Sequence, residues 1–191
     1  MKTTNIMIVG VGGQGSLLAS KLLGRLLVNE GYDVKVSEVH GMSQRGGSVV
    51  TYVRFGDKVY SPIIDKGEAD FIVSFEMLEA ARYAEYLAPG GKIIVNTQKI
   101  DPMPVVVGAM EYPGGALENL TEAGLSVDAI DALTPAIEAG TAKAVNIVLM
   151  GRLSKSLSIS REAWLSAISE TVNPKFAEMN KRAFLLGRGE E

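Results

Sequence analysis

The sequence predicts an α/β fold with a doubly wound, mainly parallel sheet. Three observations support this class. An apolar run at 5–10 turns directly into a glycine cluster and then into a helical pattern over 14–29. Further short β-type runs alternate with helical or turn segments as far as residue 132. The last third of the chain has helical patterns alone, so the sheet is confined to the first two thirds.

Composition is that of a soluble globular protein. The chain has 191 residues, which suffice for one sizeable core, and we expect a single domain over 1–191. Hydrophobic residues make up 47% and charged residues 21%. A net charge of −3 gives no drive towards nucleic acid or anionic membranes. With no apolar stretch near roughly 20 residues and no secretion signal, we expect a cytoplasmic protein without nucleic-acid or membrane partners.

The chain has no cysteine and one histidine. Disulfides, thiolate-ligated clusters and multi-histidine metal sites are therefore excluded within it, and we assign no metal ligands. Neither a G-x-S-x-G elbow nor a G-x-x-x-x-G-K-[ST] loop occurs. No nucleophile stands beside a base, so we assign no catalytic residue. The sequence indicates a ligand cradle without reaction machinery.

The first turn carries the strongest motif, because Gly10, Gly12 and Gly15 fit G-x-G-x-x-G between a strand and a helix. In a Rossmann-like fold the first glycine allows the turn, the second admits an anionic ligand and the third lets helix and strand pack closely. Free N–H groups of the first helical turn face that ligand. We take Gly13 and Gln14, within the motif, as further candidate binding residues. The motif indicates an anion-binding geometry and does not identify the ligand.

The second strand is predicted at 32–38, which completes a βαβ unit and predicts two parallel strands joined by a right-handed crossover. Glu38 lies near its end, 23 positions after Gly15. A nicotinamide-dinucleotide site uses an acid there to hold a ribose hydroxyl. The alternative is a solvated carboxylate at the end of a strand.

A polar, glycine-rich segment follows at 40–48 and has few apolar anchors. Such loops are often functional beside a glycine turn at the carboxyl ends of parallel strands. We expect it to bind phosphate or carboxylate, with an arginine forming paired hydrogen bonds, or else to be an ordinary surface loop. His40 is a candidate proton carrier or a solvent-facing side chain. The candidate binding residues of the segment are Ser43, Gln44, Arg45, Gly46 and Gly47.

The remaining strands come from alternation and β-branched content. We expect an antiparallel hairpin formed by 49–55 and 58–60 around Gly56-Asp57, inserted into the mainly parallel sheet. A helix is predicted at 76–87, and 111–124 is weakly helical at best. The other predicted strands are 70–75, 92–96, 105–109 and 125–132.

Three helices are predicted after the sheet. The first begins at Thr134-Pro135, the second spans 142–157 and is apolar almost all round, and the third begins at Asn173-Pro174 and runs to Gly187. Asn146, within the apolar helix, must find polar partners, either in the core or on a ligand. Trp164 is expected in the core or an interface rather than as a stacking platform.

Four stretches of the sequence resemble the gamma-type domain of 2-oxoacid:ferredoxin oxidoreductases, and within that family the subunits that serve indolepyruvate and other aryl pyruvates. The resemblance spans nearly the whole chain, and the H-G-M-S-Q-R-G-G stretch is its most specific part. The four stretches are Gly10-Val-Gly-Gly-Gln-Gly15, Ser37-Glu-Val-His-Gly-Met-Ser-Gln-Arg-Gly-Gly-Ser48, Val53-Arg-Phe-Gly56 and Asn146-Ile-Val-Leu-Met-Gly151.

The resemblance implies a non-catalytic subunit. In this family a larger, alpha-type partner holds thiamine diphosphate and iron–sulfur clusters, decarboxylates the 2-oxoacid to acyl-CoA and passes electrons to ferredoxin. Relatives that use coenzyme A bind it partly through the gamma-type domain. That implies coenzyme A contacts for the glycine turn and for Ser43, Gln44 and Arg45, with Asn146 beside them. Two alternatives remain: a self-sufficient NAD- or flavin-dependent oxidoreductase, and a purely structural assembly subunit.

Overall fold

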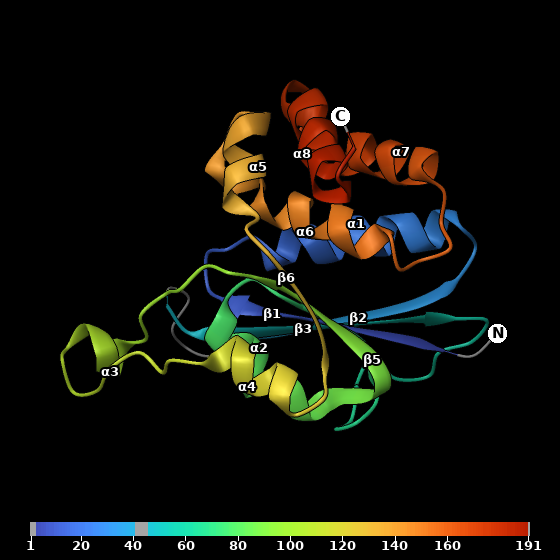
Figure 1. Ribbon diagram of the computed structural model, residues 1–191. Helices are drawn as coiled ribbons and strands as arrows, with labels where there is room; N and C mark the ends of the chain where they lie inside the picture. The colour runs from blue at the N-terminus through green and yellow to red at the C-terminus, as the bar shows by residue number, and fades with distance from the viewer. Residues whose placement is uncertain (1–2, 41–45, 191) are drawn as a thin grey trace.

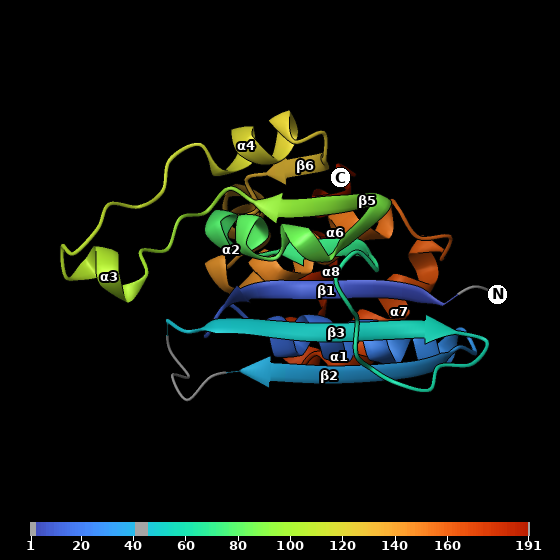
Figure 2. The ribbon, with the colours of Figure 1, turned by 90° about the horizontal axis from the view of Figure 1, so that it is seen from below.

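A six-stranded sheet separates two layers of helices (Figures 1 and 2). The computed structural model describes residues 3–40 and 46–190, apart from the side chain of His40. Strand order is β2-β3-β1-β4-β5-β6, and five strands run in one direction with β3 opposed to them. The strands are β1 Thr4–Val11, β2 Asp33–His40, β3 Ser48–Gly56, β4 Ala69–Ser74, β5 Leu87–Asn96 and β6 Ser126–Ile130.

The helices lie unevenly on the two faces (Figure 1). α1 and α6 lie against one face beneath α5, α7 and α8, and α2 and α4 cover the other, whereas α3 projects away from the body. Among the described helices, none is both long and apolar enough to cross a membrane. The helices are α1 Ser16–Asn29, α2 Met77–Arg82, α3 Met103–Val106, α4 Ala116–Glu122, α5 Leu133–Ala139, α6 Val145–Ser154, α7 Arg161–Thr171 and α8 Ala177–Arg188, with short 3-10 turns η1 Ala84–Tyr86, η2 Ala142–Ala144 and η3 Pro174–Phe176.

Successive side chains of β1 contribute to two hydrophobic clusters, one on each face of the sheet. Ile6 and Ile8 point to the large cluster under the C-terminal helices, while Met7 and Val9 point to the smaller cluster under α2 and α4. All four side chains are fully buried. Successive side chains of a strand face opposite sides of the sheet, so one continuous apolar run fits a central strand with helices on both faces.

The predicted fold class is confirmed, but the predicted hairpin is wrong in its pairing. Residues 58–60 form no strand. β3 instead lies between β2 and β1 and is antiparallel to both. β1 and β2 therefore run in the same direction, as expected, without touching. Alternation of apolar and polar residues identifies β3 as a strand. It does not determine which strands pair with β3, because that depends on residues far away in the sequence.

Two further local predictions are corrected, and one helix was not predicted. The expected strand at 105–109 is wrong, since α3 and the turn after it occupy the region. α5 begins at Leu133, because the Asp131 carboxylate accepts hydrogen bonds from the N–H groups of Leu133 and Thr134. Sequence reasoning missed α7, which Ser160 caps by accepting a hydrogen bond from the Ala163 N–H. The buried helix expected at 142–157 is confirmed as η2 and α6.

Candidate functional site

The two glycine segments meet at one edge of the sheet. β1, β4 and β5 end there, and because β3 is antiparallel, its first residue Ser48 lies at the same edge (Figure 2). The Gly12 N–H donates to the Gly47 carbonyl at 2.8 Å and joins the segments directly. Ligands of open α/β sheets bind at this carboxyl edge. The fold brings the glycine turn to this edge together with Gly47, at the described end of the second segment.

Close contacts favour glycine at two positions of the first turn. A Cβ on Gly10 would lie 2.9 Å from the Gln14 Oε1 and 3.1 Å from the Phe75 Cβ. Gly15 precedes α1 with φ +86°, and a Cβ there would lie 2.7 Å from the Asn146 Nδ2. Only glycine enters the left-handed region without a steric cost. The third glycine of the motif therefore makes room for the Asn146 side chain of α6, whereas the sequence pattern predicted close packing between the first helix and the first strand.

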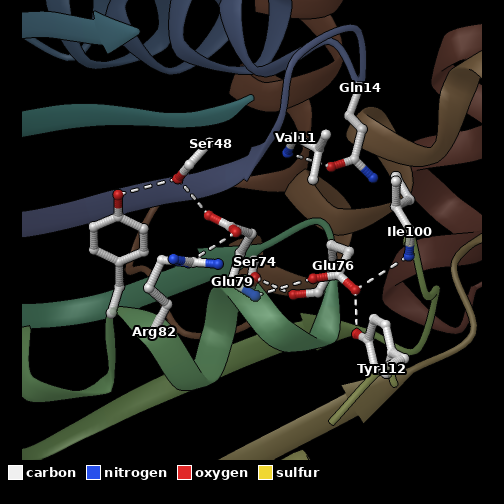
Figure 3. A network of polar contacts seen from close by, with 10 residues as sticks. Val11, Gln14, Ser48, Ser74, Glu76, Glu79, Arg82, Ile100 and Tyr112 are labelled. Atoms are coloured by element: carbon white, nitrogen blue, oxygen red, sulfur yellow. Dashed lines mark hydrogen bonds and ion pairs between the residues drawn. The ribbon is translucent and has the colours of Figure 1, made fainter. Parts of the chain in front are cut away.

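Gln14 fastens the turn to the neighbouring strand. Its Oε1 accepts a hydrogen bond from the Val11 N–H at 2.7 Å, and its Nε2 donates to the Phe75 carbonyl at 3.0 Å (Figure 3 shows Gln14 beside Val11). Both ends of the amide are thus engaged within the chain. The geometry gives Gln14 a positioning role at this turn.

Asn146 supports the same turn from below. It lies on α6, is 2% exposed, and its Nδ2 donates to the Gly15 carbonyl at 3.1 Å. Its Oδ1 accepts from the Ile147 N–H at 2.9 Å. Of the two partners predicted for this side chain, core and ligand, the structure supplies core hydrogen bonds. Asn146 therefore fixes the glycine at the start of α1.

A first hollow opens beside the turn, with a volume of about 360 Å³. The first-turn N–H groups of a helix have no partner within the helix and attract anions. Glu38 also borders this hollow, and its Oε2 accepts a 3.4 Å hydrogen bond from the Thr51 hydroxyl. A carboxylate repels phosphate but accepts hydrogen bonds from hydroxyl groups. The side of the hollow at the start of α1 therefore suits an anionic group of a ligand, and the side at Glu38 suits a hydroxyl group. Its lining comprises Gly12, Gly13, Gly15, Ser16, Leu17, Glu38 and Val49.

A second hollow, of about 160 Å³, lies beside the start of α2, and sequence reasoning missed it. On the side nearest β3, it is bordered by a series of hydrogen-bonded polar side chains (Figure 3). The Ser48 hydroxyl donates to the Glu79 carboxylate at 2.5 Å and lies 3.1 Å from the Tyr83 hydroxyl. The Arg82 Nε donates to the other Glu79 oxygen at 3.1 Å. Glu79 is 4% exposed, so these donors satisfy a carboxylate that burial would otherwise destabilise.

The second hollow also contains Glu76, which is 1% exposed. Its Oε2 accepts from the Glu79 N–H at 3.0 Å and caps α2. Its Oε1 accepts from the Ile100 N–H at 3.2 Å and from the Tyr112 hydroxyl. Burial and the adjacent Glu76 carboxylate raise the pKa of Tyr112, so that hydroxyl stays protonated as a donor. The available sequence signal was an acid placed directly between a strand and a helix.

Of the other residues singled out in the sequence, some are described by the structure and some lie outside the described residues. Gly46 borders the second hollow, and Trp164 is fully buried and stacks on Phe184 with ring centroids 5.4 Å apart. Within the described part of the chain, no three His, Cys, Asp or Glu side chains are arranged to hold a metal ion. Three of the predicted binding residues lie outside the described residues: Ser43, Gln44 and Arg45.

Comparison with known proteins gives consistent matches over the whole chain. A family model described as pyruvate ferredoxin/flavodoxin oxidoreductase matches residues 5–190. Indolepyruvate oxidoreductase subunit IorB of Thermococcus kodakarensis is 45% identical over 192 residues, which cover 98% of this chain and 95% of that protein.

Two solved structures share the fold. Pyruvate oxidoreductase subunit PORC of Thermotoga maritima gives a TM-score of 0.75 at 22% identity, covering 100% of this chain and 97% of that one. The 2-oxoglutarate:ferredoxin oxidoreductase of Magnetococcus marinus, solved with 2-oxoglutarate, coenzyme A and succinyl-CoA bound, gives 0.72 at 21% identity. That match covers 99% of this chain but 31% of the longer chain. At these identities the likeness concerns the fold alone.

Proposed function

Because the chain belongs to the pyruvate ferredoxin/flavodoxin oxidoreductase family, we propose that it is the non-catalytic, gamma-type subunit of a 2-oxoacid:ferredoxin oxidoreductase in the cytoplasm. Its substrate is indolepyruvate or a related aryl pyruvate, which the complex decarboxylates oxidatively to an acyl-CoA. The observation that carries this proposal is 45% identity to an indolepyruvate oxidoreductase subunit over nearly the full length of both chains.

The larger, alpha-type partner holds the thiamine diphosphate and iron–sulfur clusters in this proposal. Thiamine diphosphate, when bound, supplies the electron sink for decarboxylation. This chain, with no cysteine and one histidine, contributes binding surface and shape. Electrons leave the complex on ferredoxin. The whole chain, 1–191, acts as one domain in that assembly.

Coenzyme A is the ligand that best fits the first hollow in this proposal. The N–H groups of the glycine turn and of the start of α1 suit a phosphate, and Glu38 suits a hydroxyl group of the same ligand. Ser43, Gln44 and Arg45 would add donors from the second glycine segment, with Arg45 binding phosphate through paired hydrogen bonds. Asn146 acts indirectly by holding Gly15.

Reconstitution tests the proposal. The chain is co-expressed with the larger subunit of its own complex, and reduction of ferredoxin is followed with indolepyruvate and coenzyme A. Each chain alone is expected to be inactive and the complex active. Turnover of a 2-oxoacid by this chain alone would refute the assignment. In calorimetry on the complex, Arg45→Ala is expected to weaken coenzyme A binding, whereas an unchanged affinity indicates a purely structural subunit.

The alternative is a self-sufficient NAD- or flavin-dependent oxidoreductase. It is favoured by one observation, namely that Glu38 borders the same hollow as Gly12 and Gly15. Against it, β3 separates β1 from β2, which places Glu38 two strand spacings, or about 9–10 Å, from the first strand. Titration with NADH and FAD decides, since micromolar binding abolished by Glu38→Arg would support this reading.

A further inference from the structure

An apolar loop over residues 100–112 projects from the body of the molecule (α3 in Figures 1 and 2). Four large apolar side chains on it are exposed, and they gather within eight residues. Scattered exposed apolar residues are normal on a soluble protein, but a contiguous patch marks an interaction site. Their exposed fractions are 69% for Met103, 65% for Val106, 67% for Val107 and 54% for Met110.

The tip of this loop is folded although it packs on no core. The Pro102 carbonyl accepts hydrogen bonds from the N–H groups of Val105 and Val106, at 2.8 and 3.1 Å. The Pro104 carbonyl accepts from those of Ala109 and Met110, at 2.8 and 3.2 Å. The apolar side chains are therefore held on an ordered turn before any partner binds, which lowers the entropy cost of binding.

Both ends of the loop are fixed to one buried carboxylate (Figure 3). The Glu76 Oε1 accepts from the Ile100 N–H at one end and from the Tyr112 hydroxyl at the other. The Lys99 ammonium lies 5.5 Å from the centre of the Tyr112 ring. A thirteen-residue loop without such an attachment would move freely at its base. Glu76 therefore sets the direction in which the loop leaves the body.

The exposed area indicates what kind of partner fits. From their exposed fractions, the four residues together expose on the order of 400 Å², whereas a stable interface buries about 800 Å² on each partner. Two copies that met loop to loop would therefore fall short by about half. A larger chain that encloses the loop and also reaches its base, where Asp101 and Pro102 border the second hollow, can supply the rest.

We propose that residues 100–112 form a docking arm, which inserts into an apolar groove of the larger, thiamine-binding subunit and is aimed by Glu76. This inference rests on the proposed function, because it takes that subunit as the partner. It also gives the second hollow a place in the assembly, since the groove that receives the arm closes over its base.

Binding kinetics with the purified larger subunit test the arm. The double variant Val106→Ser, Val107→Ser removes apolar surface at the tip. The matched control is the double variant Val28→Ser, Ile137→Ser. These two residues are 59% and 58% exposed and lie on α1 and α5, on the face of the sheet opposite α2 and α4. The tip variant is expected to bind at least about tenfold more weakly, chiefly through faster dissociation. The control is expected to bind within twofold of the unmodified chain.

A second variant tests the attachment without touching the tip. Tyr112→Phe removes one hydrogen bond to Glu76 and is compared with Tyr60→Phe, a substitution at a residue that is 88% exposed. Because the loop must then be ordered during binding, Tyr112→Phe is expected to slow association severalfold while dissociation stays within twofold. Trypsin is expected to cleave after Lys99 faster than in the unmodified chain. Unchanged association and cleavage would overturn the role given to Glu76.

The outcomes separate this inference from the proposed function. If the unmodified chain binds the larger subunit and the tip variant binds equally well, the docking arm is overturned while the proposed function stands. If the unmodified chain does not bind that subunit at all, both fall. Concentration-dependent dimerisation of this chain that the tip variant abolishes would identify a second copy as the occupant and overturn the arm.

Discussion

Gly15 is subject to two constraints, a left-handed backbone conformation and a close neighbouring side chain. Its φ is +86°, and its missing side chain leaves room for the Asn146 amide. Gly13 has only the first constraint, since its φ is +100° and nothing lies within 4 Å of a Cβ built there. The two positions therefore separate backbone strain from crowding at the candidate site.

Substitution of these glycines should show the difference. We expect Gly15→Ala to lower the free energy of unfolding by about 2–3 kcal/mol and Gly13→Ala by about 1 kcal/mol. Urea denaturation measures both. Adding Asn146→Ala to Gly15→Ala is expected to cost less than Asn146→Ala alone, because it relieves the contact. Equal losses at the two glycines would contradict the crowding argument.

At the scale of elements, the pair α6 and α8 shows the tightest packing. A Cβ on Gly151 would lie 2.1 Å from the Phe184 carbonyl oxygen, and one on Gly187 would lie 2.1 Å from the Val148 carbonyl oxygen. Each helix thus offers a glycine to the backbone of the other. Neither backbone can retreat without moving the core that both helices cover.

Alanine at either helix contact is expected to be severely destabilising. We expect Gly151→Ala or Gly187→Ala to reduce the free energy of unfolding by about 3 kcal/mol or more, measured by urea denaturation. Gly24→Ala is the control, because a Cβ there meets only the Val36 side chain at 3.8 Å. It should leave stability unchanged or raise it by up to about 1 kcal/mol through helix propensity. Similar losses at all three positions would refute the close-contact explanation.

At the scale of the whole molecule, one carboxylate joins the sheet to the helical layer. Asp128 on β6 receives hydrogen bonds from the Arg152 Nε and Nη2 on α6, the shortest at 2.7 Å, and lies 3.1 Å from the Lys92 Nζ on β5. Burial alone would raise the pKa of Asp128, but the hydrogen bonds from Arg152 and Lys92 outweigh it and lower that pKa below its ordinary value.

This lowered pKa fixes the sign of a pH effect. Stabilisation by Asp128 is complete above the unfolded-state pKa of about 3.9 and disappears as the pH falls through the lower folded-state value. We expect Asp128→Asn to be less stable than the unmodified chain by about 1–2 kcal/mol at pH 7. Urea denaturation at pH 7, 5 and 3 should show that gap narrowing at the lowest pH. A gap that stays constant would contradict the linkage.

Local sequence patterns predicted most of the helices and strands and the position of the glycine turn between the first strand and the first helix. The glycine turn, the helix after it and the buried α6 follow from spacing and hydrophobicity, which act over neighbouring residues. The segment 105–109 shows the limit of such reasoning, because its valines favour a strand only where a neighbouring strand can pair with them. Here the chain leaves the sheet, and Pro102 and Pro104 accept the local hydrogen bonds instead.

The second hollow depends on contacts between distant parts of the chain. Ser48 and Glu79 are 31 residues apart, and Glu76 and Tyr112 are 36 apart. No local pattern pairs such residues, since the pairing results from β3 entering between β1 and β2 and from the return of the 100–112 loop. The role of Asn146 was ambiguous for the same reason, because its partner Gly15 is 131 positions away.

The position of β3 also bears on how the protein is made. Both sheet neighbours of β1 come later in the chain, at 48–56 and 69–74. Residues up to Gly47 contain only β1 and β2, which do not pair with each other in the sheet, so none of the native strand pairs can form before β3 has left the ribosome. The glycine turn can thus form its hydrogen bond to Gly47 only after Gly47 has also left the ribosome, just before β3 emerges.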